Sequence, residues 1–172
     1  MRFFSFKSFQ NQLILIMVLI IAVFSVIVSF VYFPDVYNSL WQEKKDKVQN
    51  LIQSQMTVME HYYQLSQDGE MSEAKAKKKA KGAIEVARYG DKERGYFWIN
   101  DMHPKMVMHP YKPQLNGEDL SEVQDEEGVH LFNRMVEVVK NQGSGFVEYQ
   151  WQYYDNADRV EPKLSYVQEF EP

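Results

Sequence analysis

Residues 88–110 read RYGDKERGYFWINDMHPKMVMHP and join a helical first half of the chain to a strand-rich second half. GYFWIN at 95–100 is rich in aromatic and other strand-forming residues. KMVMHP at 105–110 has the pattern of a returning strand, and residues 102–104 supply the turn between the two. The stretch therefore predicts a β-hairpin at the centre of the fold.

The two faces of the first hairpin strand differ in chemistry. Because side chains alternate along a strand, Tyr96 and Trp98 share one face, and Phe97 and Ile99 share the other. The first face carries polar tips, whereas the second is purely apolar. A plain core rarely needs so many polar-tipped aromatic residues. We therefore predict that Tyr96 and Trp98 form the wall of a ligand pocket, with ordinary core packing as the alternative.

An uncharged apolar run lies near the start of the chain. Residues 13–33 contain no charged residue and are about long enough to cross roughly 30 Å of hydrocarbon as a helix. We predict a membrane-spanning helix, because the run exceeds the apolar core of a cleavable signal and no A-x-A-like site follows it. Arg2 and Lys7 precede the run, so the positive-inside rule places residues 1–12 in the cytoplasm and residues 35–172 in the periplasm.

The charge balance and composition exclude several kinds of site. The chain carries a net charge of -5, and its N-terminal tail carries +2, so residues 35–172 carry -7. An acidic domain is not expected to bind nucleic acid. The chain has no cysteine, and its histidines lack a ligand spacing such as H-E-x-x-H. We therefore predict no metal site, no cofactor and no catalytic residues.

Two helices are predicted between the apolar run and the hairpin. Over residues 35–67, apolar residues recur mostly at three- and four-residue steps. Asp68 and Gly69 break this pattern, and Ser72 is suited to cap a shorter helix that ends near Arg88. The long helix could pair with its copy in a homodimer and carry a mechanical signal. It could equally be a stalk that holds a domain away from the bilayer.

The rest of the chain predicts one helix and two further strands. Asp125 is expected to cap a helix over residues 126–141, which Gly143 ends. FVEYQWQYY at 146–154 and KLSYVQEF at 163–170 predict strands. The order helix, helix, hairpin, helix, strand, strand favours an antiparallel sheet in an α+β domain.

Several ordered motifs resemble those of a known family. They are R-Y, G-Y-F-W-I-N-D, M-V-M-H-P, K-P-x-L-N-G-x-D-L, D-x-x-G-x-x-L-F, G-x-G-F-V-E-Y-x-W and P-K-L-S-Y-V. Together they span residues 88–172 and resemble the single Cache domain, of the second single-domain type, found outside the membrane in bacterial chemoreceptors and sensor kinases. The resemblance implies a PAS-like antiparallel sheet with flanking helices, carried on a long N-terminal helix and anchored in the bacterial inner membrane.

The resemblance also implies a function and a binding site. It implies a chemoreceptor sensor domain that binds a small organic acid such as acetate, propionate, pyruvate or lactate and signals through its membrane helix. The residues that it implies for the site are Arg88, Tyr96, Trp98, His109, Tyr149 and Lys163. Of these, Arg88, His109 and Lys163 would meet the carboxylate. Such charge-assisted donors in a mostly apolar cavity suit a compact anion.

Other roles stay open for these residues and for the chain. His109 could be a structural histidine, Arg88 could cap the preceding helix, and Lys163 could be an exposed strand residue. The alternative functions are the sensor domain of a histidine kinase or other transmembrane receptor, a membrane-anchored periplasmic enzyme, and an assembly protein. Against the enzyme, the sequence has no G-x-S-x-G elbow, P-loop or Rossmann glycine motif.

The sequence departs from the family pattern at two places. His103-Pro104 replaces the usual glycine at the hairpin turn, so we expect a turn of different shape. The sequence ends at Phe170-Glu171-Pro172, where the family usually continues with a tryptophan-containing strand, a second span and a cytoplasmic signalling region. We therefore expect a truncated domain that lacks its C-terminal strand.

Overall fold

The computed structural model describes residues 9–153 and 156–171. The chain divides into two compact units, residues 1–47 and residues 48–172. Arg2 and Lys7, on which the predicted orientation in the membrane depends, lie outside the described residues.

The first unit is helical throughout its described part. Helix α1 spans Phe9–Ile27, the π-helical turn η1 spans Val28–Tyr32, and helix α2 begins there and spans Phe33–Gln67. Pro34 lacks an N–H group and its ring clashes with the carbonyl of the residue four before it, and the wider π-helical turn directly precedes it. The described residues contain one helix, Phe9–Gln67, that is long and apolar enough to cross a membrane by length and composition, because an 18-residue stretch of it has a mean hydropathy of 3.3.

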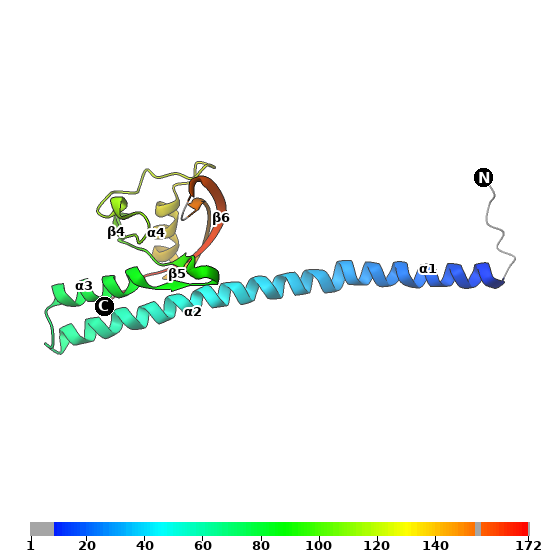
Figure 1. Cartoon of the computed structure of the whole chain (residues 1–172), viewed down its shortest axis with the longest axis horizontal. Coiled ribbons are helices and arrows are strands. Elements are labelled where there is room, and N and C mark those ends of the chain that lie inside the picture. Colours follow the sequence, from blue (N-terminus) through cyan, green and yellow to red (C-terminus); the bar gives the residue numbers. More distant parts are fainter. Residues whose placement is uncertain (1–8, 154–155, 172) are drawn as a thin grey trace. The chain divides into compact units, whose positions relative to one another are not determined.

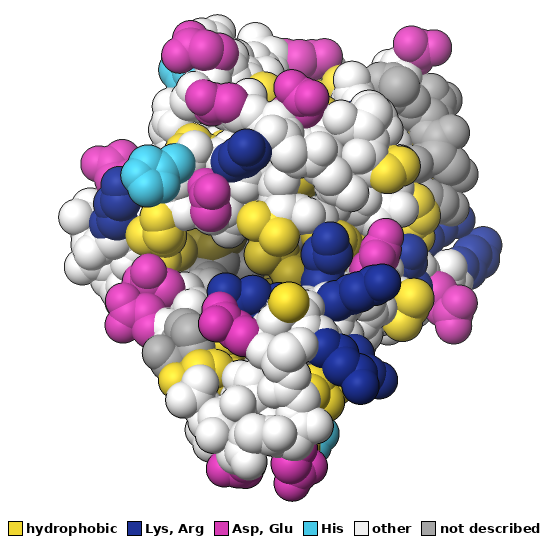
Figure 2. Space-filling view, turned by 90° about the vertical axis from the view of Figure 1, so that its left-hand side faces the viewer, with side chains coloured by type: hydrophobic (Ala, Val, Ile, Leu, Met, Phe, Trp, Pro, Cys, Tyr) yellow, Lys and Arg dark blue, Asp and Glu magenta, His cyan; other side chains and the backbone are white. Residues whose placement is uncertain are grey.

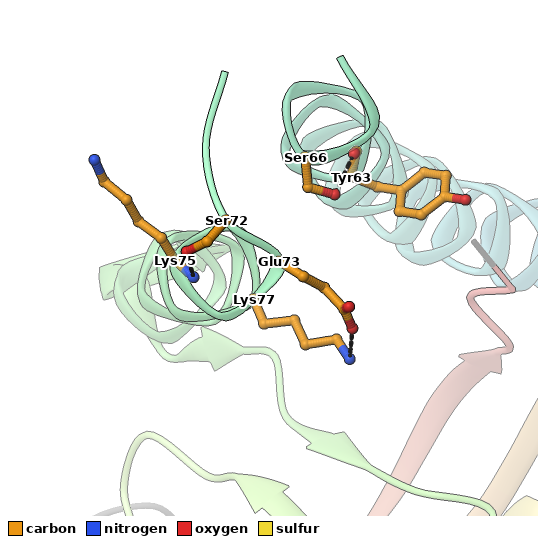
Figure 3. Close-up of polar contacts among 6 residues, drawn as sticks. All are labelled: Tyr63, Ser66, Ser72, Glu73, Lys75 and Lys77. Atoms are coloured by element: carbon orange, nitrogen blue, oxygen red, sulfur yellow. Dashed lines mark hydrogen bonds and ion pairs between the residues drawn. The ribbon is translucent and has the colours of Figure 1, made fainter. Parts of the chain in front are cut away.

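The second unit begins with a helical hairpin, in which helix α3, Glu73–Val86, returns alongside the end of α2 (Figure 1). The predicted cap is confirmed, because the Ser72 hydroxyl accepts a hydrogen bond from the backbone N–H of Lys75 at 3.4 Å. Figure 3 shows this cap beside an ion pair of 2.5 Å between Lys77 and Glu73. These contacts fix the start of α3 at the turn.

All three strand pairs are antiparallel, which confirms the predicted α+β class. The pairs are β1 (Arg88–Tyr89) with β2 (Gly95–Tyr96), β3 (Ile99–Asn100) with β4 (Met106–Met108), and β5 (Ser144–Tyr153) with β6 (Asn156–Gln168). The predicted strand over residues 95–100 is thus two short strands with different partners. Its two faces are as predicted, because Phe97 packs with the buried Ile84 and Met108, whereas Trp98 packs against a second cluster.

The prediction of a helix from residue 126, capped by Asp125, is wrong. Helix α4 spans Leu131–Gln142, and Asp125 lies six residues before it. One carboxylate oxygen of Asp125 accepts hydrogen bonds from the N–H groups of Glu127 and Val129, at 3.0 and 2.9 Å. Such local bonds from a short acidic side chain compete with helix formation. The predicted stop is confirmed, because Gly143 ends α4 in the left-handed conformation with φ of 74°.

Two hydrophobic clusters hold this unit together. The larger cluster joins α4 to β5 and consists of Met106, Leu120, Leu131, Phe132, Met135, Val147 and Tyr149. The smaller one joins the hairpin to the helices through Ile84, Phe97 and Met108, with Leu51, Ile52 and Met59 of α2 packed against it. On the face drawn in Figure 2, acidic and basic side chains are mixed, with hydrophobic side chains between them. This face therefore does not present a large patch of charge of a single sign.

Candidate ligand-binding site

Four of the six predicted site residues surround one small cavity between the hairpin, α4 and β5. Tyr96, Trp98, His109 and Tyr149 line this cavity, which has a volume of about 10 Å³. Leu131, Phe132 and Trp151 complete its wall. The polar-tipped face of the hairpin thus meets the aromatic face of β5, although Tyr96 and Tyr149 are more than fifty residues apart in the sequence.

The fifth predicted residue, Lys163, lies against two of these side chains. Its ammonium donates a hydrogen bond to the hydroxyl of Tyr96, with an Nζ to Oη distance of 2.8 Å. Its Nζ atom also lies 4.1 Å from the centre of the Tyr96 ring and 5.6 Å from that of the Trp98 ring. The register explains this position, because Lys163 on β6 is the direct cross-strand partner of Tyr149 on β5.

The charge of Lys163 has no acidic partner within the described residues. The ion pairs found there join Lys77 to Glu73 and Arg159 to Glu161. Burial, together with the positive charge of Lys112, lowers the pKa of Lys163 to about 7. Cation–π contacts with aromatic rings favour the ammonium, but they do not supply a negative charge. Lys163 is therefore a desolvated cation that an anion would stabilise.

His109 is held in one tautomer by the backbone. The residue is 3% exposed, and its Nδ1 atom accepts hydrogen bonds from the N–H groups of Tyr111 and Lys112, at 3.2 and 3.0 Å. The neutral ring must then carry its proton on Nε2. Burial, with the positive charges of Lys163 and Lys112, lowers the pKa of His109 to about 4. At neutral pH the histidine is an uncharged donor that lines the cavity.

The state of His109 predicts a pH dependence of stability. A base whose folded pKa lies at about 4, below its ordinary value of 6.5, makes the unfolded chain bind more protons between those two values. Stability is therefore complete above pH 6.5 and falls as the pH drops toward 4, by about 3 kcal/mol over the whole range. Denaturant unfolding of the full chain in detergent should show this slope. His109→Asn should flatten it.

The exposed His61 of α2 provides the matched control for this measurement. His61→Asn should leave the loss of stability between pH 6.5 and pH 4 in place. A wild-type slope that persists in His109→Asn would contradict the assignment of this proton to His109.

Tyr96 and Tyr149 are both protonated at neutral pH. Burial raises the pKa of Tyr96 to about 12, although a hydrogen bond from Trp151 opposes this shift. Burial also raises the pKa of Tyr149, and its hydroxyl is hydrogen-bonded to that of Ser165 at 2.9 Å. Trp98 donates its indole N–H to the side-chain oxygen of Asn100 at 3.0 Å. The indole and the Tyr149 hydroxyl are thus engaged within the protein, so both act mainly as walls.

The sixth predicted residue, Arg88, lies outside the cavity. Its guanidinium donates hydrogen bonds to the carbonyl oxygens of Glu85 and Ala87, at 2.7 and 2.8 Å, and so caps the end of α3. It also donates to the hydroxyl of Tyr111 at 3.1 Å, and the Tyr111 ring packs on that of Tyr96 at 5.1 Å. Arg88 is thus connected to the cavity indirectly, because it contacts Tyr111, which contacts the cavity residue Tyr96.

The sequence prediction of the site missed three residues that contact it. Trp151 lines the cavity and packs on Tyr149 with a ring separation of 6.2 Å, and strand alternation from Tyr149 could have identified it. Lys112, whose Nζ lies 4.9 Å from the centre of the Trp151 ring, comes from a loop. Ser165 belongs to the site through the hydrogen bond between its hydroxyl and that of Tyr149. No local sequence pattern indicates that Lys112 or Ser165 lies at the site.

A larger pocket lies beside the small cavity and shares Tyr96 and Trp98 with it. It has a volume of about 420 Å³ and is lined by α2 from Val48 to Met59, by Ile84, by the hairpin, by α4 and by the end of β6. It contains no lysine, arginine or histidine, so it lacks the charged donors that a carboxylate needs. The small cavity, by contrast, has the Lys163 ammonium hydrogen-bonded to Tyr96 in its wall.

The fold and this cavity define a class of protein, a small-molecule sensor domain of the Cache type. The sequence profile of the single Cache domain 2 family matches residues 26–172. The chain belongs to this family. It is 34% identical over 165 residues to the methyl-accepting chemotaxis protein McpP of Pseudomonas putida, and the match covers 96% of this chain but 30% of that protein.

Solved structures resemble the chain over most of its length. A periplasmic sensor domain of a chemotaxis protein is 39% identical with a TM-score of 0.72, and the match covers 77% of this chain and 90% of that one. A Cache chemosensory domain described for its carboxylic acid recognition is 36% identical with a TM-score of 0.73, covering 78% and 90%. A methyl-accepting chemotaxis protein from Vibrio parahaemolyticus, 21% identical with a TM-score of 0.65 and covering 78% and 84%, shares the fold.

Proposed function

We propose that this chain is the extracytoplasmic sensor domain of a chemoreceptor and that it binds a small carboxylate at the cavity lined by Tyr96, Trp98, His109 and Tyr149, beside Lys163. One observation carries the proposal. The ammonium of Lys163 is desolvated against two aromatic rings and has no acidic partner in the described part of the chain. A carboxylate would supply the missing negative charge.

The surrounding side chains support a compact and partly apolar ligand. Aromatic rings and Leu131 form most of the wall, and the protonated Tyr96 and the Nε2–H of His109 can donate hydrogen bonds beside the ammonium. A cavity of about 10 Å³ is near the size that one water molecule needs, so the rings and Lys163 have to move apart to admit an acid. Acetate, propionate, pyruvate and lactate are small acids that meet these requirements.

The proposal includes a topology and a partner. The N-terminus lies in the cytoplasm, residues 13–33 cross the inner membrane, and the sensor domain from residue 35 lies in the periplasm. Exposed apolar residues of α2, among them Val36, Leu40 and Trp41, support a homodimer formed through the long helix. A chemoreceptor is preferred to a sensor kinase because the relative that is 34% identical is a chemotaxis protein.

Thermal unfolding of the full chain in detergent tests the proposal. Acetate, propionate, pyruvate and lactate are each expected to raise the unfolding temperature in a dose-dependent way, because a ligand at about 100 times its Kd adds about 2.7 kcal/mol of stability. Acetamide has nearly the shape of acetate but no charge and should have no effect. A folded protein that none of the four acids stabilises would overturn the proposed function.

A further inference from the structure

We infer that ligand binding at this cavity takes up a proton onto Lys163, so that the affinity for a carboxylate falls as the pH rises through and above neutrality. The inference rests on the proposed function, and it concerns how the site is regulated rather than what it binds. Its starting point is the set of groups that surround the amine.

The groups that face Lys163 come from several elements, and none compensates its charge. They are Tyr96 of β2, Trp98 between β2 and β3, His109 and Lys112 after β4, Tyr149 of β5, and, by strand alternation, Glu161 and Ser165 on the same face of β6. Glu161 is the acidic member of this set, and it pairs with Arg159 on the same strand. Lys112 repels the ammonium, and the Tyr96 hydroxyl accepts its hydrogen bond without carrying a negative charge.

An amine in these surroundings gives up its proton far more readily than an exposed lysine. Burial and the charge of Lys112 lower the pKa of Lys163 to about 7, so at neutral pH about half of the ligand-free molecules hold a neutral amine. An arriving carboxylate favours the ammonium and raises this pKa again. The amine then forms a new N–H bond with a proton taken from the solvent or the buffer. The ligand keeps its ionised carboxylate and is not altered.

The sign of the pH effect follows from this balance. The folded pKa of Lys163 lies at about 7, below its ordinary value of 10.5, so the ligand-free site is about nine-tenths charged at pH 6 and about half charged at pH 7. Above that pH, the fraction able to pair with an anion falls tenfold per unit. The affinity should therefore fall about thirtyfold between pH 6 and pH 8.5. Proton uptake should grow from almost none to about one per ligand over the same range.

Isothermal titration calorimetry of the full chain in detergent, with sodium acetate as the ligand, measures both quantities. At each pH the titration is repeated in two buffers that differ in protonation enthalpy. The difference between the two binding enthalpies then gives the number of protons taken up per ligand bound. The wild-type protein should show uptake that rises with pH, together with the loss of affinity. Acetate that binds without proton uptake throughout this range would overturn the inference and leave the proposed function standing. Acetate that binds at no pH would overturn the proposed function itself.

Three variants assign the proton to Lys163. Lys163→Arg keeps a permanent charge, so it should bind with no uptake and with affinity independent of pH. Lys112→Met removes the repelling charge and should shift the loss of affinity to higher pH. His61→Asn removes an exposed histidine of α2 that does not line the cavity, so it should retain the uptake. Uptake that survives in Lys163→Arg or disappears in His61→Asn would overturn the assignment.

Discussion

Replacing Lys163 with methionine is expected to lower the affinity for acetate by about 10- to 150-fold at pH 6. The change removes one charge-assisted hydrogen bond, which contributes about 1.5 to 3 kcal/mol, while methionine keeps most of the aliphatic stem. The same substitution should stabilise the ligand-free protein by about 1 to 3 kcal/mol, because a desolvated cation without an acidic partner is lost. Calorimetric titration with acetate and denaturant unfolding of the full chain measure the two effects.

The opposite signs of these effects distinguish a binding residue from a structural one. A lysine that merely supported the fold would lose stability and affinity together. Lys79 on the exposed face of α3 provides the control, since Lys79→Met should change neither quantity. Wild-type affinity for acetate in Lys163→Met would show that the carboxylate binds elsewhere.

Replacing Leu131 with alanine is expected to lower the free energy of unfolding by about 2 to 5 kcal/mol. Leu131 is 1% exposed, begins α4 and packs in the larger cluster beside Phe132 and Met135. The truncation removes buried methyl groups and leaves a cavity that rigid neighbours cannot fill. Urea unfolding of the full chain in detergent, followed by tryptophan fluorescence, measures the loss, because Trp98 and Trp151 pack against this cluster.

The matched control for this core substitution is Val86, the last residue of α3, which is 74% exposed. Val86→Ala shortens an aliphatic side chain on a helix without opening a cavity, so it should change the unfolding free energy by no more than about 0.5 kcal/mol. A loss in Leu131→Ala no larger than in Val86→Ala would contradict the assignment of Leu131 to the core.

Much of the fold could be predicted from local patterns. Alternation along residues 95–100 placed Tyr96 and Trp98 opposite Phe97, and glycine chemistry located the end of α4 at Gly143. Asp125 shows where local reasoning failed. Its residue type suits a helix cap, but its carboxylate binds N–H groups of its own turn and, at 3.3 Å, the N–H of Gln150 on β5. A bond to a strand twenty-five residues away cannot be read from sequence spacing.

The candidate site required the register of two strands. Lys163 could have been an exposed strand residue on sequence grounds, and only its pairing with Tyr149 places it beside the cavity. Lys112 joins the site from a loop and acts on Lys163 through its charge alone. The sequence therefore named four residues that line one cavity in the structure, and their role in binding stays a prediction. The depression of the Lys163 pKa depends on tertiary contacts that no local pattern contains.

The division of residues 95–100 into two short strands has a mechanical consequence. Phe97 and Trp98 are consecutive residues between β2 and β3, yet Phe97 belongs to the smaller cluster, against which α2 packs, and Trp98 lines the small cavity. Side chains alternate along an extended segment, so these two neighbours point to opposite faces. A movement of the backbone at the peptide unit between them therefore alters the wall of the cavity and the smaller cluster together. One peptide bond separates the cavity from the packing against α2.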